Sequence, residues 1–84
     1  MSKDVLKISE PDRPKDYRLA IFEEAVGRLH RLLSEDGRLI AVTGGISLVL
    51  PLELESVLRG HIGERIGLIR TDDRKNEYRI RVIR

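Results

Sequence analysis

The sequence predicts an α+β fold in which an N-terminal amphipathic helix precedes a small, mostly antiparallel ββαββ sheet or barrel. Three features predict it: a helical apolar period over residues 14–34, four β-rich runs after Gly37, and a proline-led helical segment between the second and third runs. The 84 residues, 40% of them hydrophobic, are enough for one small domain over 14–84. Residues 1–13 mix charges and prolines without a period and are expected to form an extended or disordered leader.

The expected helix spans residues 14–34. Its apolar stripe has spacings of 3, 4, 3 and 4 and consists of Leu19, Phe22, Val26, Leu29 and Leu33. Pro14 suits the first helical turn, and Gly37 follows the point where the helix should end. Ala25 and Leu32 widen the stripe, so the helix either packs on its own domain or also pairs with a second copy.

The four expected strands are 38–43, 46–50, 64–71 and 77–84. The first two form a hairpin, because Gly44 and Gly45 tolerate the positive φ of a tight turn. Pro51 then begins a short helix that ends near Gly60. In the last strand, Tyr78, Ile80 and Val82 share one face and the arginines between them occupy the other.

Positive charge is concentrated in the C-terminal third. The whole chain has a net charge of +2, whereas residues 56–84 contain eight basic and four acidic side chains and carry +4. Arginine predominates, and its planar donor fork matches phosphate well. We therefore expect nucleic-acid contacts from Arg65, Arg70, Arg79 and Arg81. The alternative is a solvated surface on which these arginines pair with Glu64, Asp72, Asp73 or Glu77.

No constellation of residues indicates catalysis, so the chain is predicted not to be an enzyme and to have no cofactor, metal or small-molecule substrate. It has no cysteine, and neither His30 nor His61 has a second ligand at a convincing metal-site spacing. The two glycine pairs, Gly44-Gly45 and Gly60 with Gly63, fit turns better than phosphate-binding loops. Only three aromatic residues are present, and Phe22 is assigned to the core, so base stacking is not expected.

The sequence also predicts a cytoplasmic protein without a membrane segment. The longest apolar run, 46–52, is far shorter than the roughly 20 residues that cross a bilayer. The first ten residues contain two acidic side chains and lack the apolar centre of a signal peptide.

The segment 48–58, LVLPLELESVL, resembles the centre of the AbrB/MazE swapped-hairpin family. In that family an apolar strand runs into a proline, an acidic residue and an aliphatic residue that begin a short helix, as Pro51, Glu53 and Leu54 do here. The resemblance covers 38–84 and implies an interleaved homodimeric barrel that binds DNA as a transcription regulator or antitoxin. It assigns no DNA-contacting residue, because Glu55 and Ser56 stand where basic residues commonly follow.

Two functional hypotheses follow from the sequence. The first is a small noncatalytic nucleic-acid-binding regulator that forms a homodimer. The alternative is a protein-interaction or assembly module that uses the wide helical stripe. In both, self-association is expected, because a chain of this size buries a limited core on its own.

Overall fold

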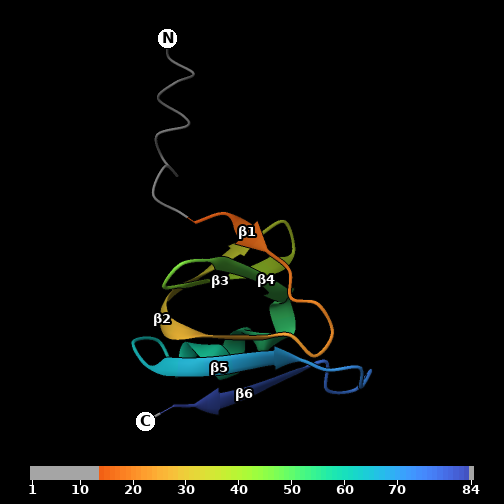
Figure 1. Cartoon of the computed structure of the whole chain (residues 1–84). Helices are drawn as coiled ribbons and strands as arrows, with labels where there is room; N and C mark the ends of the chain where they lie inside the picture. Colours follow the sequence, from red (N-terminus) through yellow and green to blue (C-terminus); the bar gives the residue numbers. More distant parts are fainter. Residues whose placement is uncertain (1–13, 84) are drawn as a thin grey trace.

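The computed structural model describes residues 14–83, which form one curled sheet and a short helical segment (Figure 1). The leader expected over 1–13 lies outside the described residues. The elements are β1 (Asp16–Tyr17), β2 (Glu24–Glu35), β3 (Arg38–Thr43), β4 (Ser47–Pro51), the 3₁₀ turn η1 (Leu52–Leu54), α2 (Glu55–Arg59), β5 (Arg65–Arg70) and β6 (Tyr78–Val82).

The N-terminal amphipathic helix predicted over 14–34 is wrong. These residues contain β1 and the 12-residue strand β2. In the described part of the chain, helical structure is confined to the three residues of η1 and the five of α2. The fold is therefore a six-stranded mixed sheet with one short helix, not an α+β domain built on a long helix.

The predicted stripe combines residues of different surfaces, since Leu29 lies in the inner core, Leu33 packs on the opposite face and Val26 is exposed; a β-bulge in β2 adds a further helical spacing. Leu29 pairs with Thr43 and Arg31 with Val42, so His30 is an extra residue with no partner in the ladder. Inward-facing positions on a strand normally recur every two residues. Because the bulge adds one, Leu29 and Leu32 both pack on the inner core at a spacing of three, which is also a helical spacing.

The sheet order is β1-β4-β3-β2-β5-β6, and every pair is antiparallel except β1 with β4. The long strand β2 joins two halves: residues 29–35 pair with β3, and residues 24–28 pair with β5. With α2 between β4 and β5, the strands β2 to β6 have the topology of a small, partly open Greek-key barrel of the OB type. Such a fold hosts many functions and by itself assigns none.

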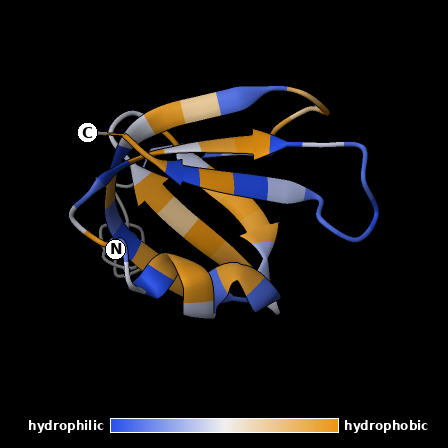
Figure 2. Cartoon of the chain, turned by 90° about the horizontal axis from the view of Figure 1, so that it is seen from below, coloured by the Kyte–Doolittle hydropathy of each residue, from blue (hydrophilic) through white to orange (hydrophobic). Residues whose placement is uncertain are grey.

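Both halves of the sheet contribute to one inner core. Its fully buried members come from β2, β3, β4, α2, β5 and the segment before β2: Leu19, Leu29, Leu39, Ala41, Leu48, Leu50, Leu58, Ile66 and Leu68. A smaller cluster of Ile40, Val42 and Val49 lies on the opposite face of β3 and β4, so these two strands are apolar on both faces. Figure 2 shows this apolar interior beside the hydrophilic loop that links β5 and β6.

The elements after residue 37 lie where the sequence predicts them. β3 and β4 form the expected hairpin through Gly44 and Gly45, but neither glycine has the positive φ expected there; the turn is closed by the Thr43 N–H, which donates to the Ile46 carbonyl at 2.9 Å. The short helix follows Pro51, and β5 and β6 pair antiparallel. Tyr78 and Ile80 pack on the core while Arg79 and Arg81 are exposed, which confirms the predicted alternation in β6.

The tight turn between β2 and β3 yields a first prediction. Asp36 and Gly37 have φ values of 51° and 76°, the positive values that a two-residue hairpin turn of type I′ requires. A side chain with a Cβ is disfavoured in this conformation by about 1–2 kcal/mol. We expect Gly37→Ala to lower the free energy of unfolding by about that amount and Asp36→Asn to be close to neutral, as measured by urea denaturation. Equal stabilities for the two variants would contradict the turn geometry.

Candidate nucleic-acid interface

One outer surface of the sheet, on β2, β5 and β6, carries most of the exposed arginines of these strands. Directly paired residues point to the same side of a sheet, as do alternate residues of one strand. The strand registers therefore place three cross-strand rows on this surface: Arg28 with Arg65, then Val26 with Gly67 and Arg81, then Glu24 with Ile69 and Arg79. We call these eight residues the arginine face. Its opposite side consists of core residues such as Ile66, Leu68 and Ile80.

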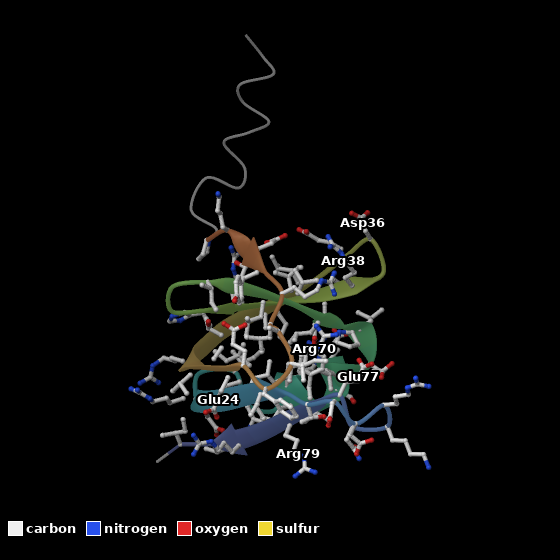
Figure 3. All side chains as sticks on the ribbon, turned by 45° about the vertical axis from the view of Figure 1, so that its right-hand side comes forward. Glu24, Asp36, Arg38, Arg70, Glu77 and Arg79 are labelled. Atoms are coloured by element: carbon white, nitrogen blue, oxygen red, sulfur yellow. The ribbon has the colours of Figure 1, made fainter. Side chains whose placement is uncertain are left out.

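The arginine face has four arginines and a single carboxylate, a formal charge of +3. Arg28, Arg65, Arg79 and Arg81 are all exposed. Arg79 projects away from the body of the protein below β6 (Figure 3). Neither Arg65 nor Arg79 has a side-chain partner among residues 14–83. Both guanidinium groups are thus available to an external anion.

Gly67 allows the one ion pair on this surface to lie across β5. The Arg81 Nε donates a 3.0 Å hydrogen bond to Oε2 of Glu24, which is two strands away. A Cβ on Gly67 would stand 2.8 Å from that carboxylate oxygen and 3.1 Å from the Arg81 Nε. Because glycine has no side chain, Glu24 and Arg81 can contact each other above Gly67. Glu24 partly neutralises Arg81 and competes with any external phosphate for it.

A shallow groove of about 410 Å³ runs over the same surface, lined by Glu24, Ile69, Arg79, Ile80 and Arg81. Between the charged residues the surface is apolar, and Val26 remains 47% exposed. A groove that is open to solvent and has two arginines in its lining is accessible to an extended polyanion.

Arg70, the fourth arginine predicted to contact nucleic acid, lies elsewhere. Its Nη1 donates a 2.8 Å hydrogen bond to the Leu19 carbonyl, and the side chain is half-buried. Figure 3 shows it near the middle of the molecule. The structure therefore brings Arg65, Arg79 and Arg81 together and gives Arg70 a structural contact.

Sequence reasoning missed Arg28, because residues 14–34 were assigned to a helix. As part of β2, Arg28 lies beside Arg65, and its Nη1 donates a 2.5 Å hydrogen bond to the Gly63 carbonyl. The alternation of Val26 with Arg28 would have indicated an outward face if the strand had been recognised.

Phe22, which the sequence assigns to the core, is 65% exposed. It lies in a tight turn, residues 20–23, in which the Glu23 N–H donates to the Ala20 carbonyl at 2.9 Å. The Glu23 carboxylate stabilises this turn from two sides: it accepts the Ala20 N–H at 2.9 Å and the Tyr17 hydroxyl at 2.7 and 2.8 Å. An aromatic ring is therefore presented to solvent at the start of β2.

The hydrogen bonds of this turn predict a pH dependence. The Ala20 N–H and then the Tyr17 hydroxyl lower the pKa of Glu23, and the hydrogen bond to Glu23 raises the pKa of Tyr17. A lowered carboxyl pKa stabilises the folded turn above the unfolded pKa, and this is lost as pH falls through the folded value. A raised tyrosine pKa stabilises the turn below the unfolded pKa and is lost as pH rises through the folded value.

We therefore expect the amide signals of residues 20–23 to report a turn that is intact at neutral pH and loosens at both extremes, as followed by NMR. In Glu23→Gln the acid transition of these signals should disappear. An unchanged acid transition in that variant would contradict the assignment to Glu23.

Within residues 14–83 there is no group of three or more potential metal ligands. His61 Nδ1 lies 2.8 Å from a Glu64 oxygen on the exposed turn after α2. A cleft of about 360 Å³ between Pro51 and the β5–β6 loop is lined by residues of both charges. Among the described helices, none is long and apolar enough to cross a membrane.

Comparisons of the chain with protein families, curated proteins and solved structures give no match. The resemblance of residues 38–84 to the AbrB/MazE family thus remains a prediction from their sequence.

Proposed function

We propose that the chain is a small, noncatalytic nucleic-acid-binding protein whose arginine face contacts the phosphate backbone. The observation that carries the proposal is the clustering of four exposed arginines on three adjacent strands, with Glu24 as their only acidic neighbour on that surface. Arginine donates to phosphate through a planar fork, and release of condensed counterions supplies the binding free energy.

The observed ion pairs favour this function over the alternative in which acidic residues of the same chain neutralise the arginines. The neutralised alternative requires the arginines to pair with Glu64, Asp72, Asp73 or Glu77. Among the described residues, Arg65, Arg79 and Arg81 form no such pair, and Arg81 contacts Glu24 instead. The charge of the face is thus only partly compensated from within the chain.

The fuller form of the proposal is a dimeric regulator in the cytoplasm. The AbrB/MazE resemblance supports dimerisation and a regulatory role, and the absence of cysteine is compatible with a reducing compartment. The competing assembly-module hypothesis relied on a helix whose wide stripe included Ala25 and Leu32. Both residues are instead partly buried side chains that pack against the inner core of the sheet, so the helical stripe on which that hypothesis relied is not formed.

A salt titration tests the proposal. Binding of a fluorescent DNA duplex of about 20 base pairs is measured by anisotropy between about 50 and about 200 mM NaCl. If the protein makes two to four phosphate contacts, the affinity should fall by about 10- to 150-fold as the salt concentration rises over this range. The full chain is used, and its oligomeric state is recorded by analytical ultracentrifugation with and without DNA. Absence of binding at the lowest salt concentration would overturn the proposal, and an affinity that is independent of salt would contradict phosphate recognition.

A further inference from the structure

Phe22 has a backbone conformation that is unusual for an aromatic residue. Its φ is 70°, at the third position of the turn 20–23. Turns that need a positive φ at this position normally have glycine or asparagine there, because a side chain with a Cβ is strained. The strain is not offset by burial, since the side chain is 65% exposed. Strained residues that persist in a fold are concentrated at binding and catalytic sites.

The surrounding contacts fix this conformation. The Phe22 N–H donates a 2.5 Å hydrogen bond to the Arg70 carbonyl, and the Arg70 N–H donates to the Glu23 carbonyl at 3.1 Å. The Arg70 side chain binds the Leu19 carbonyl on the other side of the turn. The turn is thus attached to β5 at its start and at its end. A ring presented by such a turn is positioned before any ligand arrives, which reduces the entropy lost on binding.

The turn borders the arginine face. Phe22 precedes Glu24 by two residues, and Glu24 lies in the same cross-strand row as Ile69 and Arg79. The Phe22 N–H is hydrogen-bonded to the carbonyl of Arg70, the residue that follows Ile69 on β5. The turn therefore lies at the end of the row that contains Glu24, Ile69 and Arg79, where a single strand that crosses this row can contact it.

The charges around the turn indicate the direction of that strand. On one side, Ile21 lines a hollow of about 200 Å³ whose charged residues are three carboxylates and two arginines: Asp72, Asp73, Glu77, Arg70 and Arg74. Its formal charge of −1 makes it a poorer phosphate site than the arginine face. On the other side lies the arginine face, with its net positive charge. A polyanion in contact with Phe22 is thus directed across β5 and β6 and away from the β5–β6 loop.

We infer that Phe22 stacks on an unpaired base of a single-stranded nucleic acid whose phosphates lie on the arginine face. This inference rests on the proposed function and specifies its ligand. Stacking on a side chain requires a base that is free of its own stack, which a single strand offers and an intact duplex does not. A duplex would contact the arginines alone.

The chain contains no tryptophan, so Phe22→Trp introduces a single fluorescent reporter at the turn. We expect a dT₂₀ oligonucleotide to quench its emission and a duplex of the same length to leave it unchanged. In Phe22→Ala, affinity for dT₂₀ should fall by about 5- to 150-fold, the range measured for removal of one base–aromatic stack. Affinity of that variant for the duplex should not change. The matched control is Val57→Ala on α2, since Val57 is also exposed, at 51%.

Phe22→Gly separates stacking from structure. Glycine accepts the positive φ without strain, so this variant should be at least as stable as the parent chain in thermal denaturation. It should nevertheless lose affinity for dT₂₀ as Phe22→Ala does. If both variants bind dT₂₀ like the parent and Phe22→Trp is not quenched, the stacking inference is wrong while duplex binding can still support the proposed function. If the parent chain binds neither dT₂₀ nor duplex at low salt, the proposed function fails as well.

Discussion

Replacement of Arg65 and Arg79 by glutamine should lower the affinity for duplex DNA by about tenfold or more at about 0.1 M salt and reduce the magnitude of the salt slope by about 2. Both side chains are exposed and have no partner among the described residues, so their loss leaves no buried group unpaired. Anisotropy titrations at several salt concentrations measure both effects. Thermal denaturation should show that the fold of the double variant is unchanged.

A charge-matched control distinguishes the arginine face from net charge. Arg31 lies on the part of β2 that pairs with β3, and Arg59 forms an ion pair with Glu55 on α2. The double variant Arg31→Gln, Arg59→Gln loses the same formal charge outside the arginine face. We expect it to retain most of the affinity. If the two double variants lose affinity equally, binding depends on overall charge and the assigned surface is wrong.

Glu24→Gln should act in the opposite direction. This change removes the only carboxylate of the arginine face and releases Arg81 from its ion pair. Since an exposed ion pair contributes about 0.2–1 kcal/mol, the affinity for DNA should rise by about 1.4- to 5-fold. A lower affinity would show that Glu24 positions Arg81 for binding instead of competing for it.

Leu29→Ala should destabilise the protein by about 2–5 kcal/mol. Leu29 is completely buried in the inner core next to the bulge in β2, where the two halves of the sheet meet. Domains of this kind have stabilities of roughly 0.05–0.15 kcal/mol per residue, so the loss is a large fraction of the total. Urea denaturation followed by circular dichroism measures it.

Two further variants keep this prediction testable. Leu29→Met conserves volume and should cost less than about 1.5 kcal/mol, which provides a folded variant if the alanine variant does not fold. Val57→Ala removes methyl groups from an exposed side chain and should change the stability by no more than about 0.5 kcal/mol. Equal losses for Leu29→Ala and Val57→Ala would contradict the position of Leu29 in the core.

The later elements of the fold could be predicted because their signals are local. The Gly44-Gly45 turn, the proline before the short helix and the alternation in β6 each involve neighbouring residues. β2 could not be predicted in this way, since its bulge is defined only by the partner strand β3. The Asp36–Gly37 turn was a local signal for a hairpin, but Gly37 had been assigned to the end of a helix.

The candidate site, too, could be predicted from the sequence only in part. Alternation along β6 predicted that Arg79 and Arg81 point outward, whereas the faces of Arg65 and Arg70 could not be assigned from the sequence. Arg70 could not be separated from Arg65 without the fold, since only the contact with the Leu19 carbonyl shows that its side chain serves the turn before β2. The exposure of Phe22 was also missed, because its positive φ depends on contacts with β5 from a distant part of the sequence.

The amino-acid sequence was sufficient to predict the strands after residue 37 and the concentration of arginine in the C-terminal third, and it contains no cysteine. Pairing with β3 and β5 was needed to show that residues 24–35 form a strand, because apolar spacings of three and four are compatible with a helix and with a bulged strand. It also decided which arginines share a surface, since that depends on the pairing of β2 with β5 and of β5 with β6. Turns and strand alternation depend on neighbouring residues and can be predicted from the sequence. Strand register and burial depend on contacts between residues that are distant in the sequence.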